Sequence, residues 1–236
     1  MPLAGFIPLV LLAGSGFVHA QSGNFVVSQH GQPVGTASFT VTSTSQGYDS
    51  TSLVRVAMKG LDYALSKNER LTADNRLVHA RLSATVNAAA VSVVAAPDEA
   101  QILLNISANG HASTTRLALH RASVLLADFD PGALETLLAL AVVQNSRDLW
   151  AVIPKQAGSI EPIQLATYAD QQGTLDGKPV AVHHLVATIA GASTDLFSGP
   201  ENQLLQAELP QQGFALVRVG FVLTPSARPQ APPTQP

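Results

Sequence analysis

The stretch "LVHARLSATV" (77–86) alternates between apolar and polar residues along its whole length. The apolar residues share one face of an extended chain, because successive side chains of a strand point in opposite directions. They are Val78, Ala80, Leu82, Ala84 and Val86. One buried face and one wet face are typical of antiparallel sheets. The segment therefore predicts an antiparallel strand.

The same alternation recurs along most of the chain. It is found in "QILLNISA" (101–108) and, less purely, in "ASFTVTST" (37–44) and "LVRVAM" (53–58). Further strands are expected at "DLWAVIP" (148–154), "IQLATY" (163–168), "VAVHHLVATI" (180–189), "LLQAEL" (204–209) and "FALVRVGFVL" (214–223). Turn residues separate the strands, among them the Asn-Gly and Asp-Gly pairs at 109–110 and 176–177, which tolerate tight hairpins. We expect a mainly β protein with about ten to eleven antiparallel strands, forming a strongly curved sheet or half-barrel.

One segment, "DPGALETLLALAVVQN" (130–145), has helical periodicity instead. Asp130 suits the N-cap and Pro131 the first helical position. The apolar positions then follow at helical spacing, namely Leu134, Leu137, Leu138, Ala141 and Val142. We predict an apolar helix over about 131–144, packed on the concave side of the sheet.

The two ends differ from the rest. Residues 1–20 contain a short apolar run followed by Val18-His19-Ala20, which predicts a secretory signal peptide cut after Ala20. The apolar run is too short to cross a bilayer, which takes about 20 residues. No second apolar stretch after residue 20 approaches this length, so we expect no membrane span after cleavage. The end "PSARPQAPPTQP" (225–236) predicts a Pro-rich disordered tail. A single β-rich domain over 21–224 remains, exported to the periplasm or secreted.

Composition excludes several classes of protein. The chain has no Cys, and a domain of this length can bury enough core to fold without disulfides. The net charge is −3, and no cluster of Lys and Arg is present to bind a phosphate backbone, so nucleic acid is not an expected partner. No Gly-x-Ser-x-Gly motif and no phosphate loop occur either. We expect no enzyme activity, no catalytic residue and no cofactor.

Three features resemble chemical sites and have simpler explanations. His183 and His184 are adjacent on an expected strand, so they point to opposite faces and cannot share a metal ion. The "DFD" at 128–130 resembles the start of a calcium loop, but loop position 12 is Ala139 and Asp130 suits a helix cap better. We predict no metal site. Arg218, in a very apolar strand, should face water or pair with a carboxylate such as Asp195 or Glu208.

A family resemblance rests on "FVVSQHGQPVGTASFTV", on "TDLFSGPENQLLQAEL" and on the single mid-chain helix. In these segments the chain resembles bacterial exported proteins of unassigned function, which are similar in shape to the lipoprotein-localisation factors. The resemblance implies a curved antiparallel sheet around an apolar cavity and work in the cell envelope. It implies no catalytic residues, and lipoprotein transport itself is not carried over.

Two functions remain open at this point. The first is binding of an apolar or lipidic ligand in a cavity between sheet and helix. Its candidate lining residues are Leu134, Leu137, Leu138, Trp150 and Phe197. The second is a structural or interaction protein that binds an envelope protein partner and no small ligand, suggested by the Pro-rich tail and the low surface charge.

Overall fold

The computed structural model describes residues 21–143 and 148–225. The predicted signal peptide, and the predicted tail apart from Pro225, lie outside the described residues. The helix α1 spans Pro131–Val143. The strands are β1 (Gln21–Gln29), β2 (Gln32–Thr44), β3 (Gly47–Met58), β4 (Leu61–Leu71), β5 (Leu77–Val86), β6 (Ala89–Asp98), β7 (Gln101–Ala108), β8 (His111–Ala118), β9 (Ala122–Leu125), β10 (Leu149–Ile153), β11 (Ser159–Thr167), β12 (Gln171–Leu175), β13 (Lys178–Ile189), β14 (Ala192–Ser198), β15 (Leu204–Leu209), β16 (Phe214–Arg218) and β17 (Phe221–Leu223).

The strands form one large, mostly antiparallel sheet with β1 in the middle. On one side of β1, strands β2 to β8 follow one another as neighbouring hairpins. On the other side come β16, β15, β14, β13, β11, β10 and β9, in that order. Strand β12 pairs with the first part of β13 and with β17. The edge strands β8 and β9 do not pair with each other in the described part, so the sheet is open.

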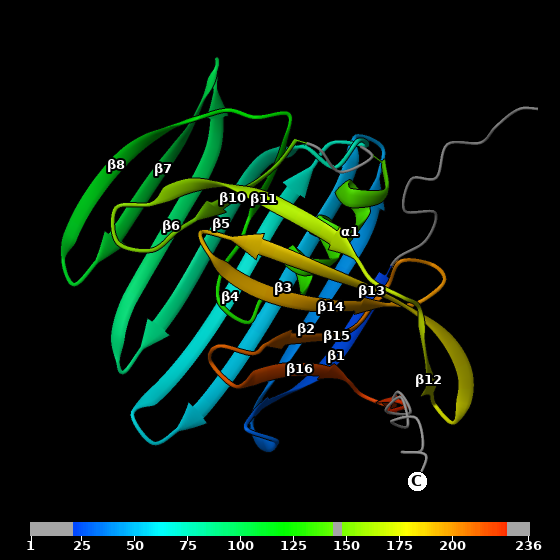
Figure 1. The fold of residues 1–236 in the computed structure, drawn as a ribbon. Helices are drawn as coiled ribbons and strands as arrows, with labels where there is room; N and C mark the ends of the chain where they lie inside the picture. Colours follow the sequence, from blue (N-terminus) through cyan, green and yellow to red (C-terminus); the bar gives the residue numbers. More distant parts are fainter. Residues whose placement is uncertain (1–20, 144–147, 226–236) are drawn as a thin grey trace, which may run out of the picture.

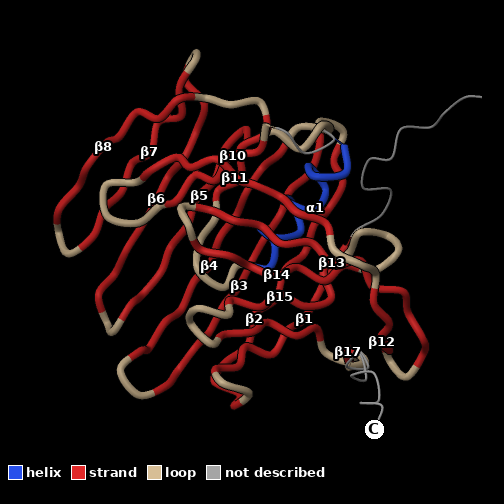
Figure 2. The backbone as a smooth tube through the Cα atoms, viewed as in Figure 1, coloured by secondary structure: helices blue, strands red, loops and turns tan. Residues whose placement is uncertain are grey.

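The sheet folds over on itself and encloses the helix. Strands β10, β11, β13 and β14 cross in front of the first half, and α1 lies between the two layers (Figures 1 and 2). The helix contacts β2 and β3 in the first half and β9 and β15 in the second. We call the face of the first half that contacts α1 the inner face, and the opposite one the outer face. The predicted apolar helix among antiparallel strands is confirmed.

The number of strands was predicted wrongly. The described residues contain 17 strands, not ten or eleven. The missed strands lack clean alternation: β4 carries Lys67 and Glu69 on its buried face, β8 is mostly polar, and β9 is buried throughout. The predicted strand 214–223 is in fact two, because the chain turns at Gly220 with a φ of 84°.

Two smaller expectations were also wrong. Strands β9 and β10 are parallel, because α1 connects them and returns the chain to the same end of the sheet. Val78 is 41% exposed, although it was placed on the buried face of its strand. The pairing register of β4 with β5 shifts between Arg70 and Leu71, and this irregularity turns Leu77 inward instead.

Most buried apolar residues form one core cluster, to which both layers of the sheet and the helix contribute. A smaller cluster lies around Val182, Phe197, Leu205 and Phe221, where β12 and β17 cover the neighbouring strands. Among the residues described, no helix is long and apolar enough to cross a membrane.

Candidate functional site

The three leucines predicted to line a cavity are packed in the core instead. Leu134, Leu137 and Leu138 are 8%, 1% and 3% exposed and belong to the main cluster. The helix that carries them contacts strands of both layers, which fill the space around it. These leucines therefore contribute apolar burial rather than an open surface.

The two aromatic candidates lie elsewhere in the fold. Trp150 stacks on His120 with the ring centroids 3.7 Å apart, and its Nε1 donates a hydrogen bond to Asp148 Oδ1 at 2.6 Å. Phe197 belongs to the smaller cluster and stacks on His184. The five predicted residues are therefore not brought together at one site, and none of them lines the cavity described next.

A cavity of about 250 Å³ opens on the inner face, near the segment that leads into α1. Its wall is apolar and comes mainly from β4 to β7. The apolar lining residues are Tyr63, Leu82, Ala84, Val86, Val91, Ile106, Ala108 and Ala127. Ligand cavities usually measure about 300–1,000 Å³, so this one suits the end of a ligand better than a whole one.

The rim of the inner cavity is polar. Asp128 and Lys155 form an ion pair at 2.8 Å, with both side chains about half exposed. Tyr63 donates a hydrogen bond from its hydroxyl to the Asp128 carbonyl oxygen at 3.3 Å. Burial, reinforced by the nearby charges of Asp128 and Asp130, raises the pKa of Tyr63, so this phenol stays protonated. An apolar wall with a charged rim suits an amphipathic ligand.

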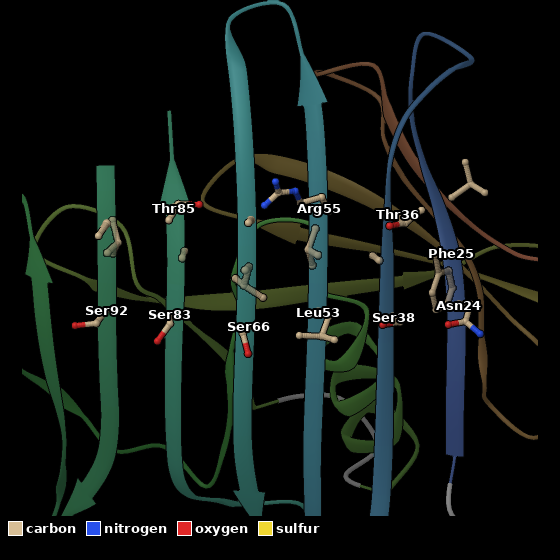
Figure 3. Close-up of a pocket in the computed structure, with 18 of the residues that line it drawn as sticks. Asn24, Phe25, Thr36, Ser38, Leu53, Arg55, Ser66, Ser83, Thr85 and Ser92 are labelled. Carbon is tan, nitrogen blue, oxygen red and sulfur yellow. The ribbon is translucent and has the colours of Figure 1, made fainter. Parts of the chain in front are cut away.

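A second hollow, the outer trough, crosses the outer face and encloses about 1010 Å³. One side chain from each neighbouring strand lies in register across its floor (Figure 3). These residues are Asn24, Ser38, Leu53, Ser66, Ser83, Ser92 and Ser107. The serines are short, which keeps the floor low. Leu53 and Val219 are 58% and 59% exposed and make this surface partly apolar.

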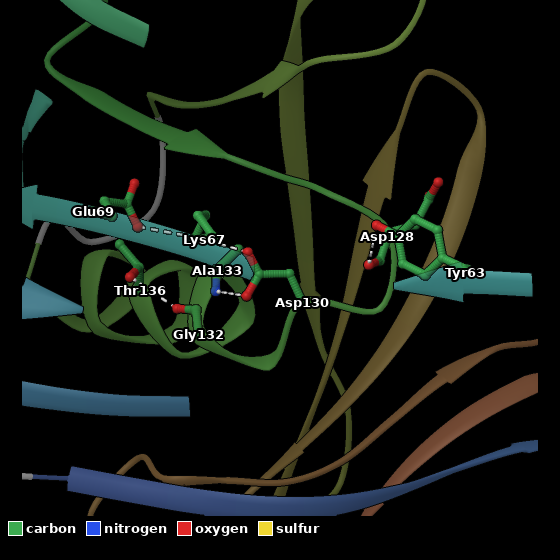
Figure 4. Close-up of polar contacts among 8 residues, drawn as sticks. All are labelled: Tyr63, Lys67, Glu69, Asp128, Asp130, Gly132, Ala133 and Thr136. Atoms are coloured by element: carbon green, nitrogen blue, oxygen red, sulfur yellow. Dashed lines mark hydrogen bonds and ion pairs between the residues drawn. The ribbon is translucent and has the colours of Figure 1, made fainter. Parts of the chain in front are cut away.

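A buried ionic cluster joins β4 to the start of the helix (Figure 4). Lys67 Nζ lies 3.1 Å from Glu69 Oε2 and 2.7 Å from Asp130 Oδ2, and all three side chains are fully buried. Asp130 Oδ1 also accepts a hydrogen bond from the Ala133 N–H at 3.1 Å. The predicted helix cap is thereby confirmed, and its carboxylate has a second role as an ion-pair partner.

The charges of this cluster do not favour catalysis. Burial alone would lower the pKa of Lys67, but Asp130 and Glu69 outweigh it and raise this pKa above its ordinary value. A permanently protonated amine cannot act as a base, even though Ser52 lies directly opposite on β3. Burial also raises the pKa of Glu69, which Lys67 offsets only in part. The cluster is best explained as an anchor for the helix.

Sequence reasoning missed Lys67 and Glu69, although a pattern in the sequence could have revealed them. In "LDYALSKNERL" (61–71), period-two alternation places both charges on the same face as Tyr63 and Leu65. Two charges on an otherwise apolar face predict a buried pair. The third member, Asp130, is 61 or more residues away in the chain and comes into contact only through the fold.

The histidine pair has separate partners. His183 Nδ1 lies 3.0 Å from Asp170 Oδ1, and His184 Nε2 lies 2.8 Å from Asp195 Oδ1. The two rings thus bond to different carboxylates, as expected for neighbouring residues on opposite faces of a strand. Among the described residues, no group of three or more His, Asp or Glu side chains could hold a metal ion.

Arg218 was expected to face water or to pair with a carboxylate such as Asp195 or Glu208, and it pairs with neither of these two. Its guanidinium is half-buried and donates to two backbone carbonyl oxygens, those of Leu204 at 3.1 Å and of Ser22. Asp195 bonds His184, and Glu208 accepts a hydrogen bond from Gln206. A guanidinium has five N–H donors, so carbonyl groups can satisfy it without a carboxylate.

Comparison of the chain with protein-family models, with curated proteins and with solved structures finds no match.

Proposed function

We propose that the chain is an exported binding protein without catalytic activity, which holds the apolar end of an amphipathic ligand in the inner cavity. The observation that supports this most directly is the apolar wall of the cavity beneath the rim ion pair of Asp128 and Lys155. Apolar surface drives the burial of an acyl chain, at about 0.8 kcal/mol for each CH₂ group. The rim amine of Lys155 suits an anionic head group.

The proposal is tested with dodecanoate as the ligand. Isothermal titration should show binding, and the variant Val91→Phe should weaken it about tenfold or more because its ring fills the cavity. Val26→Phe is the matched control, since Val26 is 36% exposed and lies on the outer face. Circular dichroism verifies that both variants fold. No binding of dodecanoate, together with organic extracts of the purified protein that repeatedly contain no lipid, would contradict the proposal.

The outer trough favours a second candidate, a protein of the cell envelope that binds a partner protein across β1 to β7. Leu53 lies in the register row on the floor and is well exposed, as expected for a contact residue. Leu53→Arg should then abolish retention of one defined envelope protein on the immobilised chain and leave dodecanoate binding unchanged. Retention that is equal with and without the substitution counts against this candidate.

A further inference from the structure

A third cavity, which we call the N-terminal cavity, lies where β1 begins. It encloses about 290 Å³, and Gln21, the first residue of β1, is part of its lining. Two carboxylates and one guanidinium also line it, those of Glu135, Glu201 and Arg218. They come from the helix, from the turn between β14 and β15, and from β16. The cavity therefore collects charged groups from distant parts of the chain.

Glu135 is a buried acid with few partners. It is 2% exposed, and its Oε2 accepts one hydrogen bond, from the Leu204 N–H at 2.8 Å. No ion pair holds it among the described residues. Burial raises its pKa to about 7, against smaller opposing effects of the Leu204 N–H and of Arg218. A carboxylate can accept about four hydrogen bonds, so this acid has acceptor capacity left.

Gln21 adds a second unsatisfied acceptor. Its side-chain Oε1 is buried and has no hydrogen-bond partner in the described part of the chain. The hydrogen bonds of Arg218 go to the carbonyl oxygens of Leu204 and Ser22, and none of them reaches Gln21 Oε1. The cavity thus presents acceptors with unused capacity on the carboxyl group of Glu135 and on the amide group of Gln21.

The backbone that follows Gln21 is held against the cavity. Arg218 bonds the Ser22 carbonyl oxygen and lies over the Phe25 ring, 5.9 Å from its centroid. Gly23 makes this approach possible, since a Cβ there would lie 2.7 Å from the rings of Phe25 and Phe39 and 3.2 Å from Arg218 Nη1. The main-chain nitrogen of Gln21 is one residue away from this fixed point.

We propose that the N-terminal cavity is a site for a primary ammonium group, and that the α-amine of Gln21, freed by cleavage after Ala20, occupies it. The second part rests on the export included in the proposed function. An ammonium donates three hydrogen bonds and accepts none, which matches the open acceptors. It also balances the charge of the cavity, because the two carboxylates of Glu135 and Glu201 are then matched by two cations, the ammonium and Arg218.

The inference predicts a stabilising effect that depends on pH. The α-amine has an ordinary pKa of about 7.7–8.0, and a facing carboxylate raises it. The ammonium in turn favours the charged form of Glu135. The stabilisation is therefore present below the ordinary pKa of the amine and is lost as the pH rises through its raised value in the folded protein.

The test compares three proteins: one that begins at Gln21, the same protein acetylated at Gln21, and one extended by Gly-Ser before Gln21. Mass spectrometry first verifies that Gln21 has not cyclised with loss of ammonia. At pH 7 the free-amine protein should melt at a higher temperature than the other two. The difference should disappear above pH 10 and in Glu135→Gln versions of all three. Equal melting temperatures in the three proteins would overturn the inference.

A second measurement reports on the amine directly. Labelling of the α-amine by an amine-reactive reagent at pH 7 should be about tenfold slower than in the Glu135→Gln version, which corresponds to a pKa one unit higher. Equal rates would refute the contact. Methylammonium added to the acetylated protein tests whether an external amine can occupy the cavity in place of the chain's own α-amine. A raised melting temperature in its presence supports the site with an external ligand. Dodecanoate binding, at another cavity, should not change, so the two proposals fail independently.

Discussion

Replacing Lys67 by Met should destabilise the fold more than any other change to a charged residue that we consider. Met has a similar length and fills the space, so the loss comes from the charges left behind. Glu69 and Asp130 would remain fully buried without their cation. Removing one partner of a buried ion pair costs about 3–5 kcal/mol. The whole stability of a domain is about 5–15 kcal/mol, so the variant should be only marginally folded.

The assay is thermal and chemical denaturation at pH 7, followed by circular dichroism. At about 4 kcal/mol, the melting temperature should fall by about 10 °C for a chain of this size. Arg70→Met is the matched control on the same strand, because the ion pair of Arg70 with Asp49 is exposed and should be worth less than about 1 kcal/mol. If Lys67→Met costs no more than the control, the buried cluster does not hold the helix as we argue.

Glu69→Gln separates the charge from the hydrogen bond. The cluster has two carboxyl groups for one amine, and burial raises the pKa of Glu69 above its ordinary 4.5. The folded state then keeps a proton that the unfolded state loses, so the contribution of Glu69 is greatest below pH 4.5 and falls as the pH rises through the raised value. The stability of the variant relative to the natural protein should therefore increase from pH 4.5 to pH 8. A decrease over this range would refute the reasoning.

Further expectations concern single sites and are measured by thermal and chemical unfolding. Leu138→Asp should unfold the protein, because an unpaired carboxylate at a site that is 3% exposed costs several kcal/mol. Val142→Asp on the same helix is the control: its site is 55% exposed, so it should cost less than about 1 kcal/mol. His183→Ala and His184→Ala should each cost no more than about 1–2 kcal/mol and leave dodecanoate binding intact; lost binding with an unchanged melting temperature would contradict this. Gly35→Ala should cost about 3 kcal/mol, because the new Cβ would meet the Arg55 carbonyl oxygen, and a cost near zero would show that the strand can shift.

Local patterns predicted the parts of the fold that local physics determines. Alternation identifies a strand when one face is buried and the other wet, as in residues 77–86, and the helix at Pro131–Val143 was found from its cap and its spacing. Strand β9 has four buried residues and no exposed face, so periodicity cannot distinguish it from loop or helix. Its parallel pairing with β10 depends on where α1 docks, which no short stretch of sequence specifies.

The candidate site was less predictable than the fold. Its residues were expected on the helix, because an apolar helix among strands suggested a cavity beside it. In the structure the second layer of the sheet covers the helix, and the inner cavity lies farther along β4 to β7. Residues such as Val91 and Ala108 have the same alternating pattern whether a layer covers them or not. Which of them stay uncovered is set by the length and path of β10 and β11, a property of the whole chain.

The buried cluster and the inner cavity are connected through the segment between β9 and the helix. Leucines alone would let α1 slide or turn within the core, because apolar contacts are not directional. The contact of Asp130 with Lys67 and its bond to the Ala133 N–H fix the first turn of the helix in one position. Asp128 and Ala127, which form part of the cavity, lie only two and three residues before this fixed point. A costly buried charge at the start of the helix is thus understandable as the means by which the wall of the inner cavity is held in place.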